Sequence, residues 1–318
     1  MMIKRCLLSI AICLITLLSV SAQDAQPIFE RGVRQLQAKQ LNDAIVSFSE
    51  YQRLEPTEPA APFNIGLCYY TLQRYGDALP FFQKAAELKT DYTDAYIYTG
   101  NTLDLMGRYK EAIAAYVKAV EIEPKNAAIH YELGVAHFNQ HNYRSAAEAY
   151  ESCIELDPSN GKCLASLGHV YNAMTRYSDA RRVLAKAVDV DPTNASIEFD
   201  LGNANYNDAR YAEAVPHYRK AIELLPKFKS AFAYLGDAYA NLRQDDLAIA
   251  AYEQALSLDQ KLVPALYGLA KLYIAKKDKS RSMDQIEKLK LLDSGRATKL
   301  LAEWNIAFPT TSIAVAKP

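Results

Sequence analysis

The sequence predicts an all-α fold, an α-α superhelix of about eight helix-turn-helix repeats closed by a C-terminal capping helix. Three observations predict this class. Seven glycines recur at a fixed spacing. An alanine stands twelve residues after each glycine, and a bulky apolar residue stands sixteen residues after each glycine. Proline recurs 24 residues after the glycine in five of seven periods. The glycines are spaced by 34 residues without a slip, at Gly32, Gly66, Gly100, Gly134, Gly168, Gly202 and Gly236. Such a period is typical of stacked supersecondary units.

Composition supports a folded chain and argues against nucleic-acid binding. Half of the 318 residues are hydrophobic and 23% are charged, so the chain can bury a sizeable core. Without the first 22 residues, which carry Lys4 and Arg5, 34 basic residues face 37 acidic ones, a net charge of −3. A nucleic-acid partner needs a surplus of cations on the binding face. We therefore expect no nucleic-acid partner.

The first element, residues 1–22, reads as a secretory signal peptide. Lys4 and Arg5 precede an apolar run of 15 residues, Cys6 to Val20, and small residues then offer a cleavage site before Gln23. The alternative is an uncleaved anchor, but the run is shorter than the ~20 residues that span a bilayer. We expect export to the periplasm or the outer membrane, with a eukaryotic secretory lumen left open. We also expect no transmembrane segment in the mature chain.

Each repeat then reads as two helices and a tight turn, as residues 127–160 illustrate. Ile129, Leu133 and Ala136 lie at helical spacing, and a second apolar stripe begins at Ala146 and continues with Tyr150. Glycine inside a helix costs up to ~1 kcal/mol relative to alanine, so its recurrence must be offset by close packing of the two helices. A lone hairpin buries one face only, and stacking the next hairpin buries the other.

These residues resemble the tetratricopeptide repeat, whose signature has small residues at positions 8, 20 and 27 and proline at position 32. The resemblance implies an array over 23–296, with seven repeats and a degenerate eighth in which Ser282 replaces the expected alanine. Their bounds are 25–58, 59–92, 93–126, 127–160, 161–194, 195–228, 229–262 and 263–296. The first repeat carries Arg31 and Gln35 where apolar residues are usual, as expected for an exposed terminal repeat.

The last predicted elements are a capping helix over 297–308 and a flexible tail over 309–318. Ala297, Leu300, Leu301, Trp304 and Phe308 fall on one helical face at spacings of three and four. The remaining face is largely polar. The single tryptophan is therefore interpreted as a packing residue.

In the family, a concave groove is lined by the first helix of each repeat, chiefly at positions 2, 5, 9, 12 and 13. Carried onto this sequence, these positions hold aromatic residues interleaved with asparagines, and unlike the framework they vary between repeats. Asparagine can donate to and accept from an extended peptide, while aromatic rings anchor its side chains. The alternative is that many of these rings only pack between adjacent helices. The candidate residues are Phe63, Tyr70, Asn101, Asp104, Tyr131, Phe138, Asn139, His169, Asn172, Phe199, Asn203, Tyr206, Asn207, Asp237 and Asn241, with Leu67, Ile97, Val135, Lys162, Tyr267 and Lys271 at further groove positions.

Two chemistries are rejected for this groove. Chaperone-binding members clamp a terminal carboxylate with a lysine at position 5 and an asparagine at position 9, but position 5 carries no cation in any repeat here. Charges of both signs, such as Asp104 and Asp237 against Lys162 and Lys271, disfavour an anionic polymer. The partner is expected to be a protein or peptide.

Catalytic and metal-binding patterns are missing from the sequence. It contains no phosphate-binding glycine loop, no G-x-S-x-G and no H-E-x-x-H. His137 and His141 could share a helical face, but His141 falls at the turn and no acidic ligand is in register. We therefore predict no catalytic residues, no metal site and no cofactor.

Three cysteines follow the leader, and all occupy positions that other repeats fill with small residues. Cys68, Cys153 and Cys163 are therefore interpreted as core residues. A Cys153–Cys163 disulfide is an alternative in an oxidising compartment, and counting free thiols decides between the two.

The function expected is a non-enzymatic adaptor of the cell envelope that holds a polypeptide in its groove. The aromatic groove leaves open a second hypothesis, a module that binds peptidoglycan or another glycan. An enzyme is the remaining alternative, and it would need a catalytic site without any known motif. The oligomeric state is left undetermined.

Overall fold

The computed structural model describes residues 25–309, so the predicted leader and the tail beyond Pro309 lie outside the described residues. Within that range every regular element is an α-helix. The chain divides into two compact units, residues 1–158 and 159–318, and each is described by itself. The predicted all-α class of paired helices is confirmed.

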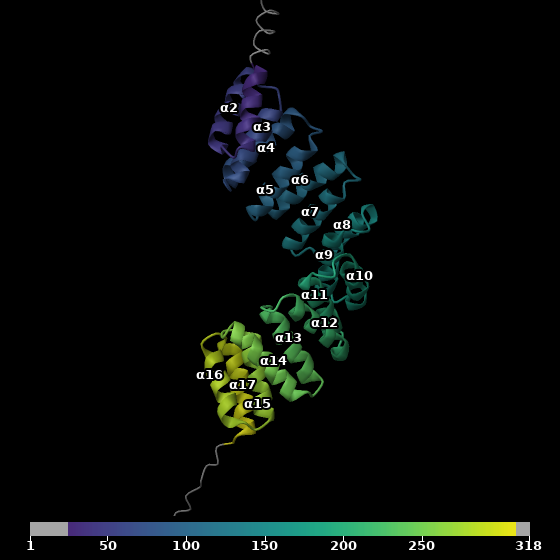
Figure 1. Cartoon of the computed structure of the whole chain (residues 1–318), viewed down its shortest axis with the longest axis vertical. Helices are drawn as coiled ribbons and strands as arrows, with labels where there is room; N and C mark the ends of the chain where they lie inside the picture. The colour runs from purple at the N-terminus through teal and green to yellow at the C-terminus, as the bar shows by residue number, and fades with distance from the viewer. Residues whose placement is uncertain (1–24, 310–318) are drawn as a thin grey trace, which may run out of the picture. The chain divides into compact units, whose positions relative to one another are not determined.

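The first unit is a row of helical hairpins (Figure 1, purple to teal). Within it, α3 pairs with α4, α5 with α6 and α7 with α8, while α2 packs on α3, α4 on α5 and α6 on α7. Residues 25–37 form a helix that precedes α2. The other helices are α2 (Leu41–Leu54), α3 (Ala60–Thr71), α4 (Tyr75–Leu88), α5 (Thr93–Leu105), α6 (Tyr109–Ile122), α7 (Ala127–Asn139) and α8 (Tyr143–Leu156).

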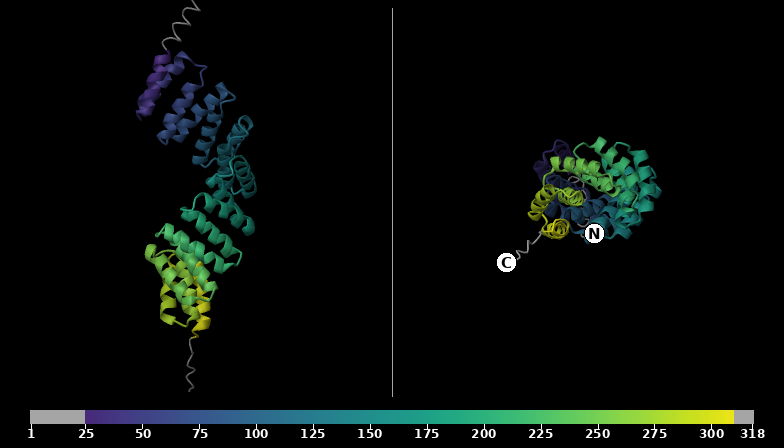
Figure 2. Two further views of the ribbon diagram at one scale, coloured as in Figure 1. Left: turned by 45° about the vertical axis from the view of Figure 1, so that its right-hand side comes forward. Right: turned by 90° about the horizontal axis from the view of Figure 1, so that it is seen from below.

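The second unit repeats the same pairing and ends in a single helix. Its hairpins are α9 with α10, α11 with α12, α13 with α14 and α15 with α16, and α17 packs on both α15 and α16 (Figure 2, left, yellow). Its helices are α9 (Gly161–Ala173), α10 (Tyr177–Val190), α11 (Ala195–Asn207), α12 (Tyr211–Leu224), α13 (Lys229–Asn241), α14 (Asp245–Leu258), α15 (Val263–Ala275), α16 (Lys279–Lys290) and α17 (Ser294–Ala307).

The recurring glycine is the point where the two helices of a hairpin cross. A Cβ added to Gly134 would lie 2.5 Å from the ring of Tyr150, and one added to Gly202 would lie 2.6 Å from the ring of Tyr218. The other five glycines of the series face the residue sixteen positions later in the same way. The large side chain of the second helix thus fills the space that a side chain on the first helix would take. This packing offsets the low helix propensity of glycine.

The turn inside each hairpin places one residue in the left-handed region. In the fourth repeat, His141 has φ 60°, and the N–H of Asn142 donates to the carbonyl of His137 at 2.9 Å. This bond closes a left-handed C-terminal cap on the first helix. The same conformation recurs every 34 residues, at Lys39, Gln73, Gly107, His141, Thr175, Ala209, Arg243 and Lys277. Only one of the eight is glycine, so glycine periodicity did not mark this position.

The first hairpin exchanges apolar packing for a polar network. Arg31 donates from Nε to Ser47 Oγ at 3.0 Å, and Ser47 donates to Gln35 Oε1 at 2.7 Å. Arg31 also pairs with Glu50. Ser47 is buried, so these hydrogen bonds satisfy polar groups at the start of the stack.

The last hairpin is closed by α17 through one specific contact. Trp304 donates from Nε1 to Ser282 Oγ at 3.0 Å, and Ser282 is fully buried. The serine that departs from the repeat pattern is therefore the partner of the tryptophan. Ile286, Leu289 and Leu300 are fully buried around this contact. Trp304 is a packing residue, as its sequence position indicated.

Candidate functional site

The predicted groove residues lie on the first helices of the hairpins, on α3, α5 and α7 in the first unit and on α9, α11 and α13 in the second. Most of them are partly buried, while His169, Asn207 and Asn241 are exposed. The two sets belong to different units, so each is described separately.

Two of the predicted aromatic residues serve mainly as packing. Phe63 is 9% exposed, and its ring centroid lies 5.7 Å from that of Phe82 and 4.9 Å from that of Tyr92. Phe199 contacts Tyr218 at 5.8 Å and Phe228 at 4.8 Å between centroids. For these residues the alternative of packing between helices describes the structure better than an open groove surface.

The other rings of the first unit are half-buried and each contacts its neighbours. Tyr70 meets Tyr75 and Tyr98 edge to face at 5.5 and 5.6 Å. Phe63 also contacts Tyr98, at 5.5 Å, which joins the two predicted residues of α3 into one aromatic cluster. Tyr131 and Phe138, both on α7, contact the rings of Tyr150 and Tyr143 on α8.

Position 9 of the repeat, on the first helix, is tied to the tyrosine at position 24 on the second. In three repeats the tyrosine hydroxyl donates to the side-chain oxygen of the position 9 residue. The pairs are Tyr116 with Asn101 at 2.6 Å, Tyr218 with Asn203 at 3.0 Å and Tyr252 with Asp237 at 2.5 Å. The buried hydroxyl is thereby satisfied, and the side chain at position 9 is held in one orientation.

A second set of bonds links position 12 of one repeat to position 13 of the next. Asn139 Nδ2 donates to Asp104 Oδ1 at 3.2 Å in the first unit. In the second unit, Asn241 Nδ2 reaches the hydroxyl of Tyr206 at 3.3 Å. These four predicted residues are therefore brought together in pairs, and the pairs align neighbouring first helices.

Two predicted residues of α9, the exposed His169 and the partly buried Asn172, converge on Asp200 of α11. Asn172 Nδ2 donates to the backbone carbonyl of Asp200 at 2.9 Å, and His169 Nδ1 lies 3.3 Å from its carboxylate. The hydrogen bond with Asp200 raises the pKa of His169, because it favours the protonated ring. The Oδ1 atom of Asn172 is buried and has no hydrogen-bond partner among the described residues. Asn207 stands apart, exposed at the end of α11.

One cavity of about 530 Å³ opens on this face of the second unit. The predicted residues Tyr206, Asp237 and Asn241 line it, and the groove positions Tyr267 and Lys271 of α15 complete its far wall. The remaining lining residues are Ala240, Arg243, Tyr252, Gly268, Leu272 and Ala275. Aromatic, amide and charged side chains from α11, α13 and α15 therefore converge on one hollow.

The carboxylate of Asp237 is the least solvated charged group of this hollow. Burial raises the pKa of Asp237 to about 6, against the lowering effect of the Tyr252 hydrogen bond and of the Lys271 charge. Burial likewise raises the pKa of Tyr206 to about 12. Removal from water disfavours the ionised form of both groups.

Family models match the chain over more than half of its length. A tetratricopeptide repeat model matches residues 29–93, 166–227 and 199–265, a second matches residues 127–160, and a TPR repeat model matches residues 100–141. The chain belongs to the tetratricopeptide repeat (TPR) family. It is a TPR scaffold, and its paired helices form the solenoid fold of that family.

Solved TPR structures resemble the chain in fold. PilF of Pseudomonas aeruginosa is 23% identical with a TM-score of 0.58, and covers 66% of this chain and 97% of its own. YrrB, described as a TPR protein with an unusual peptide-binding site, is 24% identical (TM-score 0.52; 58% and 96%). MamA is 24% identical (TM-score 0.51; 53% and 92%). At these identities the likeness concerns the fold alone. Comparison with curated protein sequences gives no match.

The TPR chain offers no assembled metal site within residues 25–309, since no three His, Cys, Asp or Glu side chains there are grouped for one. His141 lies in a turn with φ 60° and is exposed. His137 is partly buried, and burial lowers its pKa. Among the same residues no helix is long and apolar enough to cross a membrane.

The three cysteines of the TPR array are all buried. Cys153 and Cys163 are disulfide-bonded residues, whereas Cys68 is a free thiol whose pKa burial raises to about 11. A thiol so protected from ionisation is a poor nucleophile.

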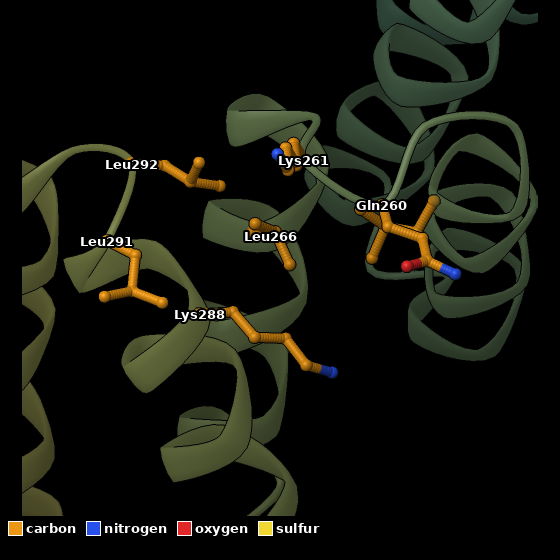
Figure 3. Close-up of a pocket in the computed structure, with 7 residues that line it drawn as sticks. Gln260, Lys261, Leu266, Lys288, Leu291 and Leu292 are labelled. Atoms are coloured by element: carbon orange, nitrogen blue, oxygen red, sulfur yellow. The ribbon is translucent and has the colours of Figure 1, made fainter.

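A second cavity lies away from the groove positions (Figure 3). It encloses about 600 Å³ between α14, α15 and the end of α16. Leu266, Leu291 and Leu292 line it beside the stems of Lys261 and Lys288. Its lining residues include no aromatic ring and no carboxylate.

Six residues that line the groove cavity are not among the predicted groove positions, namely Ala240, Arg243, Tyr252, Gly268, Leu272 and Ala275. Tyr252 is the bulky residue sixteen positions after Gly236, and its hydroxyl contact with Asp237 is visible only once the helix crossing is known. Gly268 is out of phase with the glycine series, and a side chain there would collide with the ring of Tyr252. An off-period glycine beside a groove position was the available signal.

Proposed function

We propose that this TPR chain is a non-enzymatic adaptor, exported to the cell envelope, that binds a segment of a partner polypeptide along the first helices of its repeats. The observation that carries the proposal is the oriented amide at position 9. Asn101 and Asn203 each accept a tyrosine hydroxyl on Oδ1, which leaves the Nδ2 donors for a ligand. Fixed donors on a groove match the backbone carbonyls of an extended peptide.

The surrounding side chains suit a polypeptide better than a glycan. Sugar stacking needs open aromatic faces, whereas Tyr70 and Tyr206 present edge-to-face contacts to neighbouring rings. Half-buried tyrosines of this kind are typical anchors for the side chains of a bound protein segment. We therefore expect no retention of the chain on isolated sacculi, and retention there would favour the glycan hypothesis.

The location rests on the leader alone. The short positive region, the apolar run and the small residues at 20–22 favour cleavage before Gln23. Expression of the full chain in a bacterial host should give a periplasmic product whose intact mass corresponds to residues 23–318. A product that retains residues 1–22 would contradict cleavage, and its fractionation with membranes would support the anchor.

The groove assignment is tested by removing the free amide donors without disturbing the tyrosines. Asn101→Asp and Asn203→Asp keep an acceptor for the hydroxyl, as Asp237 does in the seventh repeat. In pulldown from an envelope extract, we expect each variant to capture about tenfold less of the partner that the wild-type chain enriches, because a hydrogen bond to the ligand is lost.

The matched controls change exposed residues on second helices. Glu155→Gln on α8 and Asp189→Asn on α10 alter one charge each at exposed positions, and capture should be unchanged. Melting curves monitored by circular dichroism check that all four variants fold. Equal capture by all of them would show that the partner binds elsewhere.

A further inference from the structure

The seventh repeat differs from the third and the sixth at position 9, where the carboxylate of an aspartate replaces the amide of an asparagine. The tyrosine at position 24 donates to Asn101 in the third repeat and to Asn203 in the sixth, but to Asp237 in the seventh. The chain itself thus shows that a neutral amide satisfies the hydroxyl. The negative charge of Asp237 is not needed to hold the hairpin together.

The negative charge of Asp237 is partly buried, which is unfavourable for a residue that only holds the hairpin together. It lies in a crowded hollow where burial outweighs the charge of Lys271, so that the pKa of the carboxyl rises to about 6. An unneeded charge that is partly removed from water costs stability. Such a cost is typical of a residue kept for binding.

Only one of the two carboxylate oxygens of Asp237 has a hydrogen-bond partner among the described residues. Its Oδ1 atom accepts the Tyr252 hydroxyl, and among the described residues Oδ2 has no hydrogen bond or ion pair. Lys271 lines the same cavity, but its nitrogen lies 5.8 Å from the ring centroid of Tyr267 rather than within 4 Å of Asp237. One carboxylate oxygen therefore remains available to a ligand.

The walls suit the stem of a long side chain. Tyr206 comes from α11 and Tyr267 from α15, on either side of Asp237 on α13. Asn241 and Arg243 stand among the lining residues one turn further along. A carboxylate attracts ammonium and guanidinium groups through its charge, and an aromatic ring attracts them through its quadrupole. The Tyr267 ring already has Lys271 and Arg296 at 5.8 and 5.9 Å from its centroid. A cavity of about 530 Å³ has room for such a side chain.

We propose that this cavity is a specificity pocket for a lysine or arginine side chain of the bound polypeptide, whose cationic head pairs with Asp237 between Tyr206 and Tyr267. The inference deepens the proposed function, on which it rests. The opposite reading, an acidic side chain held by Lys271 and Arg243, makes the opposite prediction for each variant below.

The test uses acetylated, amidated pentapeptides that differ only at the central residue, Gly-Gly-Xaa-Gly-Gly with arginine, glutamine or glutamate. Binding to the chain of residues 23–318 is followed by NMR titration at pH 7.5. We expect the arginine peptide to bind at least tenfold more tightly than the glutamine peptide, as a charge-assisted hydrogen bond implies. The glutamate peptide should bind more weakly still.

Two variants give the sign of the charge effect. Asp237→Asn keeps the acceptor for Tyr252 and should reduce arginine-peptide binding about tenfold, with no loss of thermal stability. Lys271→Met removes the competing cation and should strengthen it. Loss of binding in Lys271→Met, equal binding of the three peptides, or tighter binding of the glutamate peptide would each overturn the pocket.

Failure of this inference can be told apart from failure of the adaptor function. If Asp237→Asn captures the envelope partner as well as the wild-type chain, while Asn101→Asp or Asn203→Asp does not, the groove binds its partner and the basic-side-chain pocket is wrong. If all three variants lose nothing, the groove itself is wrong.

Discussion

At the scale of single residues, the proposed recognition rests on the side chain at position 9. The tyrosine hydroxyl needs only an oxygen acceptor, which Asn203 and Asp237 supply equally. The choice between amide and carboxylate is therefore free to serve recognition. The stability of the chain should record the difference, because only the carboxylate titrates.

We predict that Asp237→Asn stabilises the chain at neutral pH and has little effect in acid. The folded pKa of about 6 is above the ordinary value of 3.8, so the folded state holds the proton more tightly than the unfolded state. The stabilisation by protonation is complete below pH ~4 and is lost as pH rises through 6. The full penalty above pH 7 is about 3 kcal/mol, at about 1.4 kcal/mol for each pKa unit.

Thermal unfolding at pH 4 and pH 8 measures this difference. The variant should melt several degrees higher than the wild-type chain at pH 8 and almost with it at pH 4. A lower melting temperature at pH 8 would mean that the charge of Asp237 stabilises the fold, for instance through Lys271, and would remove the argument that the framework does not need it.

The glycines of the series are the residues at which packing has least freedom. We predict that Gly134→Ala destabilises the chain by about 1–3 kcal/mol, since a Cβ would lie 2.5 Å from the ring of Tyr150. Gly76→Ala is the matched control, because nothing lies within 4 Å of its added Cβ. That change should be neutral or stabilise α4 by up to ~1 kcal/mol. Chemical denaturation compares the two, and equal effects would contradict the close crossing.

At the scale of elements, the turn within a hairpin can hold a residue whose backbone is strained, and the sequence pattern does not reveal this strain. Thr175 adopts φ 59°, a conformation that is strained for a β-branched residue. Thr175→Gly should therefore stabilise the chain by about 1 kcal/mol. The reverse change, Gly107→Thr at the equivalent turn with φ 73°, should destabilise it by a similar amount. If instead Thr175→Gly destabilises the chain and Gly107→Thr stabilises it, glycine's larger loss of entropy on folding outweighs the strain.

The sequence predicted elements well because each hairpin is locally specified. The 34-residue spacing of Gly134 and its relatives fixes both the crossing and the helix pairs. Contacts between neighbouring elements were less accessible. Ser282 departs from the alanine that the repeat pattern predicts, yet it accepts the hydrogen bond of Trp304 that holds α17 on the last hairpin. The pattern of a single helix does not indicate this contact.

The candidate site was predicted in outline and not in detail. Groove positions could be assigned by phase, but whether a ring is exposed depends on neighbours from other repeats. The rings of Phe63 and Phe199 pack against Tyr92 and Phe228, respectively, so part of each ring is turned away from a ligand. The hollow at Asp237 needs α11, α13 and α15 at once, and such a convergence is invisible to a one-dimensional pattern.

At the scale of the whole molecule, stability should be a sum over neighbouring hairpins, because helices contact chiefly the helices next to them in the sequence. A local defect should then stay local. Gly202→Ala places a Cβ 2.6 Å from the ring of Tyr218, between α11 and α12. Hydrogen exchange should accelerate in α11, α12 and the adjoining α13, while α15, α16 and α17 in the same unit keep their protection.

The control for this experiment lies in the same unit. Gly295→Ala, near the start of α17, meets its nearest neighbour at an ordinary 3.6 Å and should leave exchange unchanged. Mass spectrometry of peptic fragments resolves the helices one by one. Uniform acceleration from α9 to α17 in Gly202→Ala would mean that the unit unfolds as one cooperative body. In that case a ligand at the Asp237 cavity would stabilise the entire unit rather than the repeats that it touches.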